Sequence, residues 1–361
     1  MSTERKLSRD TTTQKISETA AREFLTRVND LFETKPFLPH RLFGGGNAQT
    51  LAAWGWPHRY RFKPVSDQER LFEVAPGVRV LAHCRWQTGP QNHPTLVMWH
   101  GIEGSTASGY MPSTAQKAFR TGFNVVRVNL RNCGGTEHLT HTLYHAGLSE
   151  DLRAVLAELV EVDRLPALFM VGFSLGGNMA LKCAGEYGGN PPRQLLGVCA
   201  VSPSVDPAAS VASIMLRSNW IYHRDFVRRL SHKIQTKHKL FPELYDISKL
   251  SQVRTLKDFD EQYTSRAHGF ASADDYYQKA AALNVIDQIR IPTLILHAED
   301  DPFIPFAALR HPAVSGNPYV LLVATKRGGH VAFVARQRDG EDRWWAENRV
   351  VEFCKLASES F

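Results

Sequence analysis

The sequence lacks long apolar runs, a secretory signal and a pattern of paired cysteines. Its 361 residues contain no apolar run near the roughly 18–20 residues that cross a bilayer. No apolar stretch follows the charged positions of the first 20 residues, which predicts that no secretory signal is present. The five cysteines are scattered, odd in number and without a C-x-x-C pair, which argues against a disulfide framework and a structural zinc site. We therefore expect a protein of the reducing cytoplasm.

An excess of positive charge is also missing from most of the chain. The net charge is +7, from 43 Lys and Arg against 36 Asp and Glu. The segment Arg217–Lys257 holds ten basic and three acidic residues and so carries the whole excess. A chain that was basic throughout would favour general nucleic-acid binding. This distribution indicates one basic segment on a neutral body of ordinary globular composition, with 43% apolar and 22% charged residues.

Short apolar or β-branched runs alternate with helical patterns along most of the chain. The alternation predicts the α/β class, with a mostly parallel central sheet flanked by helices on both faces. The helical patterns cover residues 21–34, 112–120, 149–160 and 178–187. The predicted strands are Leu71–Val74, Val78–Trp86, Thr95–His100, Asn124–Leu130, Leu168–Phe173, Leu196–Val201, Thr293–His297 and Val320–Ala324.

The alternation stops between Ser202 and Asp287, where the sequence is polar, aromatic, basic and mainly helical. We interpret this stretch as an inserted helical cap over the carboxyl edge of the sheet, where α/β sheets bind ligands. The predicted organisation has five parts. They are a polar tail and short helix (1–35), an N-terminal arm (36–64), the first part of the core (65–204), the basic helical cap (205–286) and the second part of the core (287–361).

The motif Gly172-Phe173-Ser174-Leu175-Gly176 is the strongest indication of chemistry. It follows an apolar strand and precedes a helical pattern, the context that G-x-S-x-G requires. A serine on so sharp a turn leaves no space for side chains two residues before and after it, and glycines fill both places. A chance match in a loop is the alternative, which the flanking strand and helix disfavour. The motif predicts that Ser174 is a nucleophile.

A serine hydroxyl needs a base to take its proton, and the base needs an acid to orient it. His330 follows the last predicted strand after two glycines and is the predicted base; a surface or packing histidine is the alternative. Asp301 lies in the loop after the preceding strand and is the predicted acid, with Asp300 as its main rival and Asp206 as a third candidate. The chain order Ser174, Asp301, His330 is that of α/β-hydrolases.

Two backbone N–H groups are expected to stabilise an oxyanion. One belongs to Leu175, directly after the nucleophile. The other is predicted at Ile102, in the segment His100-Gly101-Ile102-Glu103 after the strand that begins at Thr95. We expect His100 to hold this loop by hydrogen bonds, and Glu103 to point away from the oxyanion as a salt-bridge or capping residue.

Other polar side chains carry weaker signals. Cys133 lacks an assignable base, which favours a packing role. His138, His141 and His145 do not match the H-E-x-x-H spacing of a helical zinc site. The sequence therefore predicts neither a metal nor a cofactor.

Several of these segments together resemble the YheT-like branch of the α/β-hydrolases, across residues 36–353. The segments are His100–Ser105, Arg131–Thr136, Tyr144–Gly147 with Glu150–Leu152, Gly172–Asn178, Asp300–Phe303 and Gly328–His330. The resemblance implies an α/β-hydrolase fold and a charge-relay triad of Ser174, Asp301 and His330. The branch includes bacterial proteins assigned as esterases, eukaryotic phospholipases acting on medium-chain acyl groups and fungal enzymes that make medium-chain ethyl esters. It therefore implies activity on short- to medium-chain acyl esters or acylglycerols.

We expect a serine hydrolase that cleaves carboxylic esters through an acyl-enzyme on Ser174. Acyl transfer to an alcohol is the alternative. A catalytically silent binding protein is less favoured, because all three triad positions are filled.

The expected partner is a small-molecule ester, and no nucleic acid is expected because no recognition motif is present. The basic cap is interpreted either as solvated helix faces or as an outer face, with Arg228, Arg229 and Lys233, that contacts anionic membrane lipid or an acidic group of the substrate.

Overall fold

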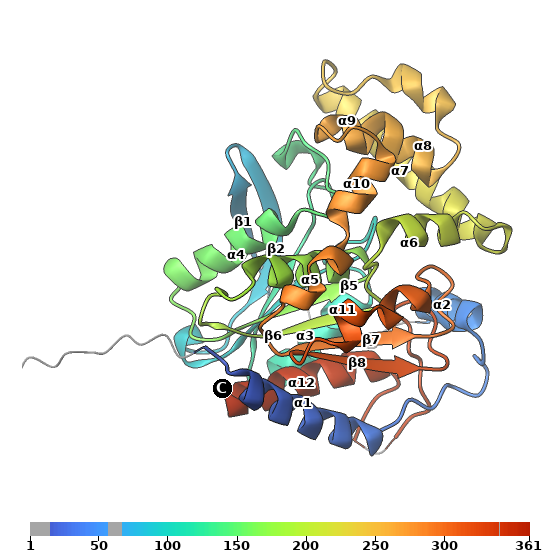
Figure 1. Ribbon diagram of the computed structural model, residues 1–361. Coiled ribbons are helices and arrows are strands. Elements are labelled where there is room, and N and C mark those ends of the chain that lie inside the picture. The colour runs from blue at the N-terminus through green and yellow to red at the C-terminus, as the bar shows by residue number, and fades with distance from the viewer. Residues whose placement is uncertain (1–14, 57–66, 339) are drawn as a thin grey trace, which may run out of the picture.

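The computed structural model describes residues 15–56, 67–338 and 340–361 (Figure 1). The predicted polar tail before residue 15 and the last part of the predicted arm, residues 57–64, lie outside the described residues. The described part is built around one eight-stranded sheet with the order β1-β2-β4-β3-β5-β6-β7-β8. Only β2 runs against the other seven strands, since it pairs antiparallel with both β1 and β4.

All eight strands predicted from the sequence are present, with ends that differ by at most three residues. They are β1 Gln68–Ala75, β2 Val78–Arg85, β3 Thr95–Trp99, β4 Asn124–Val128, β5 Leu168–Phe173, β6 Leu195–Val201, β7 Thr293–Ala298 and β8 Val320–Thr325.

The burial of each strand follows from its place in the sheet. Every residue of the central strands β3, β4 and β5 is buried, because helices cover both of their faces. In β2, near the antiparallel edge, buried positions alternate with more exposed ones. The central strands are therefore the rigid elements from which the site's loops project.

Two helical layers enclose the sheet. Phe24, Met111 and Phe353 belong to one apolar cluster on the face covered by α1, α3 and α12, while Leu156, Met179 and Val314 belong to the cluster under α4, α5 and α11. These helices are α1 Glu18–Glu33, α3 Tyr110–Arg120, α4 Ser149–Glu161, α5 Leu175–Tyr187, α11 Pro312–Ser315 and α12 Trp345–Ser360.

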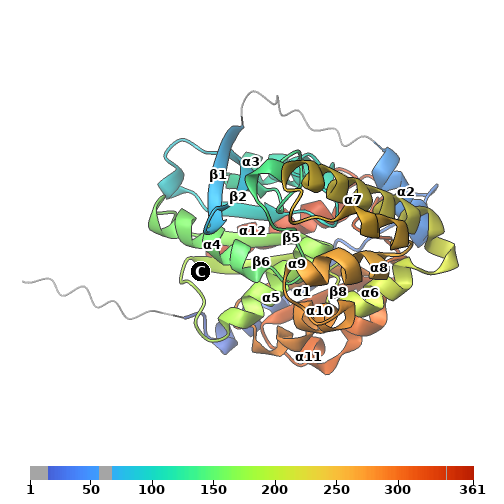
Figure 2. The same cartoon turned by 90° about the horizontal axis from the view of Figure 1, so that it is seen from above.

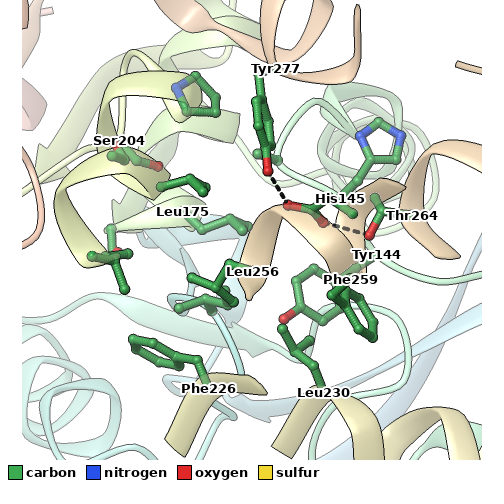
Figure 3. Close-up of a pocket in the computed structure, with 18 of the residues that line it drawn as sticks. Tyr144, His145, Leu175, Ser204, Phe226, Leu230, Leu256, Phe259, Thr264 and Tyr277 are labelled. Carbon is green, nitrogen blue, oxygen red and sulfur yellow. Dashed lines mark hydrogen bonds between the residues drawn. The ribbon is translucent and has the colours of Figure 1, made fainter. Parts of the chain in front are cut away.

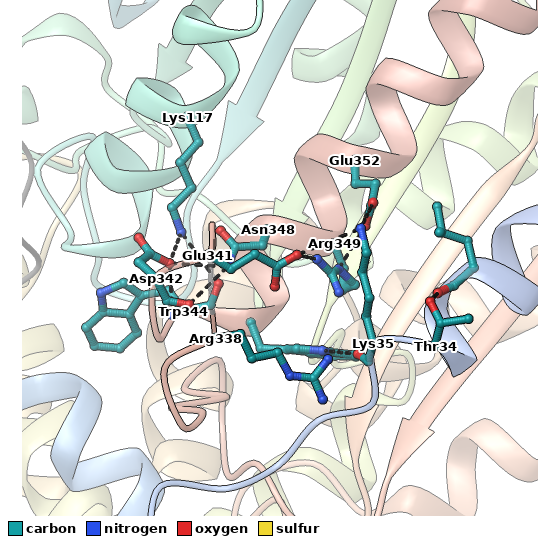
Figure 4. A network of polar contacts seen from close by, with 12 residues as sticks. Thr34, Lys35, Lys117, Arg338, Glu341, Asp342, Trp344, Asn348, Arg349 and Glu352 are labelled. Atoms are coloured by element: carbon teal, nitrogen blue, oxygen red, sulfur yellow. Dashed lines mark hydrogen bonds and ion pairs between the residues drawn. The ribbon is translucent and has the colours of Figure 1, made fainter.

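A polar network fixes the start of the N-terminal arm to the last helix (Figure 4). Arg349 on α12 is almost fully buried and forms ion pairs with Glu341 and Glu352. Lys35, just after α1, approaches the same two carboxylates. Because both cations contact both carboxylates, this network holds the start of the arm against α12.

Residues 15–56 contain more helix than the sequence predicted. Helix α1 begins at Glu18, because the Ser17 hydroxyl accepts a hydrogen bond from the Ala20 N–H and caps its first turn. The arm also contains a helix that was not predicted, α2 Gly46–Gly55.

Helices α6–α10 follow β6 and gather on one side of the sheet, which they overlie when seen from above (Figures 1 and 2). Residues 202–292 are all described, and they contain no strand. The elements are α6 Pro207–Ile214, α7 Trp220–Leu240, α8 Leu256–Phe259, a π-helical turn Asp260–Thr264, α9 Ser265–Ala267 and α10 Ala273–Ala280. No helix in the described ranges is both long and apolar enough to span a bilayer.

The basic residues of α7 are not all on its outer face. Arg228 is exposed and pairs with Asp225, and the side chain of Arg229 is about half exposed at 41%. Lys233, in contrast, is buried and points toward the sheet, where it donates to the Asn132 carbonyl. The expectation that Lys233 belongs to an outward basic face is therefore wrong. Lys237, one helical turn on, is also buried and donates to the Glu137 and Thr140 carbonyls.

Candidate active site

Ser174 occupies a sharp turn between β5 and α5. Its backbone has φ 54° and ψ −117°, a conformation that a non-glycine residue adopts at a cost in strain. The turn also brings neighbouring backbones very close. A Cβ on Gly172 would lie 2.1 Å from the Gly176 carbonyl oxygen, and a Cβ on Gly176 would lie 2.6 Å from the His100 oxygen. Only glycine fits at these two positions, which accounts for the motif.

The structure brings Ser174, His330 and Asp301 into one chain of contacts. The Nε2 atom of His330 is 2.9 Å from the Ser174 Oγ, and its Nδ1 atom is 2.8 Å from Asp301 Oδ2. The second carboxylate oxygen of Asp301 accepts hydrogen bonds from the N–H groups of Phe303 and Ile304, at 2.8 and 3.0 Å. The carboxylate is thus held on both oxygens.

The surroundings of Asp301 favour its ionised form. Its side chain has no solvent exposure. Burial acts to raise the pKa, but the charge and hydrogen bond of the His330 imidazole, aided by His297 and the Phe303 N–H, outweigh it, and the pKa is lower than usual. An ionised carboxylate at this point orients the imidazole and would stabilise an imidazolium.

Neither rival carboxylate contacts the histidine ring. Asp300 accepts a hydrogen bond from the Gly329 N–H at 3.0 Å and so supports the loop that carries His330. Asp206 caps α6 by accepting from the Ala209 N–H at 3.0 Å. The geometry therefore separates Asp301 from the two alternatives.

The loop of His330 rests on residues that the sequence analysis missed. The His330 N–H donates to the hydroxyl of Thr50 on α2 at 2.9 Å, and the Val331 N–H donates to the Ser202 hydroxyl at 3.1 Å. Gly46, at the start of α2, is so close that a Cβ would lie 1.8 Å from the Asp300 carbonyl oxygen. The run of three glycines at residues 44–46 was the available signal for this contact.

The loop after β3 passes directly beside the nucleophile. A Cβ on Gly101 would be 3.0 Å from the Ser174 Cβ. The Gly101 N–H donates to the Tyr110 hydroxyl and the Glu103 N–H to the Tyr144 hydroxyl, at 3.0 and 3.2 Å.

The two amides expected to hold an oxyanion have no such acceptors. Within the described ranges, neither the Ile102 N–H nor the Leu175 N–H donates to another group of the protein. Both residues line the pocket that contains Ser174 and His330. Their donors are thus available to a ligand in that pocket.

His100 and Glu103 behave as expected. His100 is buried, accepts the Leu130 N–H on Nε2 at 3.1 Å, and contacts the Gly101 carbonyl through Nδ1. Burial lowers the pKa of His100 to about 4, so the ring is neutral and holds the loop. Glu103 lies 3.1 Å from the Nζ atom of Lys233 and accepts a hydrogen bond from the Tyr144 hydroxyl at 2.9 Å.

Two hollows meet at Ser174 and His330. One lies beneath the cap and is lined mainly by apolar side chains, including Leu175, Phe226 and Phe259 (Figure 3). The other opens between α2 and α7 and is lined by Trp54, Trp56, Tyr110 and Arg229, among others. An ester bond placed at Ser174 would have space for one substituent on each side.

The remaining candidates do not form a second reactive centre. Cys133 is buried, which raises its thiol pKa to about 12, and the cation beside its sulfur is Lys233. Packing is therefore its role. In the part of the chain that the structure describes, no group of three His, Cys, Asp or Glu side chains is placed to hold a metal ion.

Comparisons with known proteins agree with this architecture. Residues 94–336 match the family model described as the alpha/beta hydrolase fold. The chain is 31% identical over 333 residues to "Putative esterase YheT" of Escherichia coli, covering 91% of this chain and 95% of that protein. It is 26% identical over 337 residues to the Saccharomyces cerevisiae medium-chain fatty acid ethyl ester synthase/esterase 2, covering 83% and 67%.

Among solved structures, the Pyrococcus furiosus esterase Pf2001 is similar, with a TM-score of 0.52 at 17% identity. The match covers 83% of this chain and 98% of that one. At this identity the likeness bears on the fold, and it agrees with the predicted α/β-hydrolase architecture.

Proposed function

Because the chain belongs to the YheT-like branch of the α/β-hydrolase family, we propose that it is a serine hydrolase that cleaves carboxylic esters. The observation that carries the proposal is the chain of contacts from Ser174 through His330 to Asp301. The names of the relatives, an esterase and an ethyl ester synthase/esterase, support ester substrates. The relatives favour hydrolysis over obligatory transfer of the acyl group.

In the proposed mechanism, the Ser174 oxygen attacks the ester carbonyl while His330 Nε2 takes its proton. The Asp301 carboxylate steadies the resulting imidazolium through Nδ1. The imidazolium then protonates the leaving alcohol as the carbon–oxygen bond breaks, which leaves the acyl group on Ser174. Water, deprotonated by His330, attacks this acyl-enzyme and releases the acid.

The negative oxygen of each tetrahedral intermediate is assigned to the N–H groups of Ile102 and Leu175. Their lack of acceptors in the described chain supports this role. Such donors stabilise charge that develops in the transition state and cost no reorganisation during the reaction, because they are already in place.

The two hollows divide the substrate. The apolar hollow beneath the cap is assigned to a short- to medium-chain acyl group, whose burial is favourable against Leu175, Phe226 and Phe259. The groove between α2 and α7 is assigned to the alcohol, since its lining is more polar and includes Arg229 and Tyr110. The proposal requires no metal or cofactor.

The direct test replaces Ser174 with alanine. Turnover of p-nitrophenyl butyrate should fall to background, and a fluorophosphonate probe should label the wild-type protein at Ser174 and leave Ser174→Ala unlabelled. The exposed Ser218 provides the matched control, Ser218→Ala, which should keep full activity. Retained turnover in Ser174→Ala, with an unchanged circular dichroism spectrum, would overturn the assignment. Ethyl ester formation in added ethanol would reveal acyl transfer at the same serine.

We also propose that the cap side of the molecule touches anionic membrane, through a surface that shares only Arg228 with the predicted one. Exposed apolar side chains lie at the start of α7, where Trp220 is 58% and Ile221 60% exposed. The exposed Arg217, Arg224 and Arg228 are spaced around them on the same stretch. A mixture of aromatic, aliphatic and basic side chains suits the surface of a membrane with negative lipids.

This surface is next to the proposed alcohol groove. Trp54, which lines the groove, is 56% exposed and packs edge-on against Tyr222 of α7, with ring centroids 5.5 Å apart. A substrate drawn from a membrane would enter between these two helices.

For the compartment we propose the cytoplasm, which the five free and buried cysteines support.

A further inference from the structure

One side chain of the hollow beneath the cap does not suit a purely hydrocarbon acyl group. Asp260, at the start of the π-helical turn, is among the lining residues. Such turns are uncommon and are frequent at functional sites. Here the turn carries a carboxylate into a surface that is otherwise mostly apolar.

The carboxylate is oriented by two hydroxyl groups. Oδ1 accepts from Thr264 and Oδ2 accepts from Tyr277 of α10, both at 2.7 Å (Figure 3). A carboxylate offers about four acceptor positions, so these two bonds leave capacity for a further donor.

No cation in the described part of the chain balances this group. Within the described residues Asp260 makes no ion pair, and Lys233, which lines the same hollow, is paired with Glu103. Burial raises the pKa of Asp260 to about 6, against the effect of its two hydroxyl donors. Asp260 is partly buried. A carboxylate in such a place without a cation is costly and is retained more readily where a ligand uses it.

A donor lies in the lining of the same hollow. The Nδ1 atom of His145 accepts the Gly147 N–H at 3.0 Å, which places the proton of the neutral ring on Nε2. Burial keeps the pKa of His145 well below its usual value, so the ring stays neutral. No acceptor for Nε2 exists within the described ranges.

The position of these groups indicates which part of a substrate they would meet. In Figure 3, Thr264 and His145 lie across the hollow from Leu175, the neighbour of the nucleophile. An acyl chain attached to Ser174 would therefore extend toward them. A hydroxyl is the group that can donate to a carboxylate and accept from an imidazole N–H at once, and the nearby Lys233 disfavours an ammonium group.

We propose that the hollow beneath the cap selects acyl chains that carry a hydroxyl group remote from the ester carbonyl, with Asp260 as the acceptor and His145 as the donor. The inference rests on the proposed function, because it assigns the acyl side of the same reaction. It differs from a simple medium-chain pocket in one measurable respect. An apolar pocket disfavours a hydroxylated chain, whereas a site that hydrogen-bonds a hydroxyl disfavours the chain that lacks it.

The test compares methyl esters with acyl chains of six, eight, ten and twelve carbons, each unsubstituted, ω-hydroxylated or ω-aminated, by kcat/KM. Wild-type protein should prefer the hydroxylated ester over the unsubstituted one at one or more chain lengths. Asp260→Leu should lower this preference by about 10-fold or more. Tyr277→Phe is the matched control, because it removes a donor to Asp260 and keeps the carboxylate, so the preference should persist.

Each outcome decides the matter. A hydroxyl preference at or below one at every length, or a preference for the aminated ester, overturns the inference. A hydroxyl preference that is unchanged in Asp260→Leu also overturns the inference. If Asp260→Leu fails to fold, the wild-type ratios alone decide. Failure of the proposed function is distinct, since no ester of any kind would then be cleaved in a Ser174-dependent way.

Discussion

Lys233 on the cap helix α7 and Glu103 in the loop after β3 form a buried ion pair, with Nζ and Oε1 3.1 Å apart. Glu103 follows Ile102, whose N–H is proposed to hold the oxyanion. Arg229 adds a second link from the same helix, since it donates to the Glu103 carbonyl oxygen. Part of the basic charge of α7 therefore fixes the cap to the reacting centre.

Replacing Lys233 with methionine should damage both stability and catalysis. Removal of one partner leaves the other charge buried and unpaired, which costs about 3–5 kcal/mol. A loosened Glu103 should also displace the Ile102 N–H, and loss of one oxyanion donor costs roughly 100- to 1,000-fold in kcat. We therefore expect kcat for ester turnover to fall by about 10-fold or more in Lys233→Met. Urea unfolding measures the accompanying loss of stability.

The double variant Lys233→Met/Glu103→Gln is the control for this pair. It removes both charges, so it should recover much of the lost stability. If Lys233→Met alone unfolds at the same urea concentration as wild type and keeps its kcat, the ion pair has no such role.

Replacing Asp301 and Asp300 one at a time with asparagine should distinguish the residue that orients His330 from the residue that supports its loop. Asp301→Asn should lower kcat by about 1,000- to 10,000-fold, because the amide would favour the wrong imidazole tautomer. Asp300→Asn keeps the shape of a side chain that accepts from the Gly329 N–H, so its effect on kcat should be far smaller. Equal losses in kcat would contradict the assignment.

The lowered pKa of Asp301 also makes a prediction about stability. The pKa of Asp301 is lower in the folded state than in the unfolded state, where an aspartate has a pKa of about 3.9. Its carboxylate therefore stabilises the fold at pH values above this unfolded pKa, and the contribution disappears as the pH falls through the folded pKa. Asp301→Asn should therefore unfold at a lower temperature than wild type at pH 7, and the difference should shrink toward pH 3. Thermal unfolding at several pH values measures this, and a difference that grows toward acid pH would be the wrong sign.

A side chain at position 101 should lower activity, because it would lie beside Ser174. A Cβ there would lie 3.0 Å from the Ser174 Cβ and 3.5 Å from its Oγ, the space where a substrate carbonyl must approach. Gly101→Ala should lower kcat/KM by about 10-fold or more with little change in thermal stability, since a 1 Å misplacement can cost roughly 100-fold. Gly55→Ala is the control, because no atom lies within 4 Å of its added Cβ. Equal activity in the two variants would show that Gly101 is replaceable.

Local sequence patterns predicted the sheet well, and they singled out side chains that the fold brings together. Each strand has its own apolar or β-branched run, so all eight could be located. Ser174 could be proposed as the nucleophile because its turn demands glycines at fixed distances, and His330 could be proposed as the base because its loop follows the last strand. These signals are short-range, which is why one sequence was sufficient.

Contacts between distant segments were harder to predict. Thr50 lies 280 residues from the His330 N–H, whose hydrogen bond its hydroxyl accepts. The glycine run at residues 44–46 indicates a close approach, but it does not indicate which segment is approached. Lys233 looked like a surface residue because α7 is basic, but only the packing of α7 on the loop of Glu103 decides which of its charges turn inward. Burial of a charge depends on the partner it meets, and that partner is set by the tertiary fold.

The exposed start of α7 yields a prediction about membrane binding. Trp220→Ser and Ile221→Ser each remove an apolar side chain that is more than half exposed, so they should weaken binding to vesicles of anionic lipid by several-fold while leaving turnover of p-nitrophenyl butyrate unchanged. Val162→Ser is the matched control, since Val162 is 68% exposed just after α4. Co-sedimentation with vesicles of phosphatidylcholine alone or mixed with phosphatidylglycerol measures the effect, and rising salt should reduce it, because the screening length is about 10 Å at 0.1 M. An equal loss of vesicle binding in Val162→Ser, or a wild-type protein that does not bind anionic vesicles, would contradict the proposed surface.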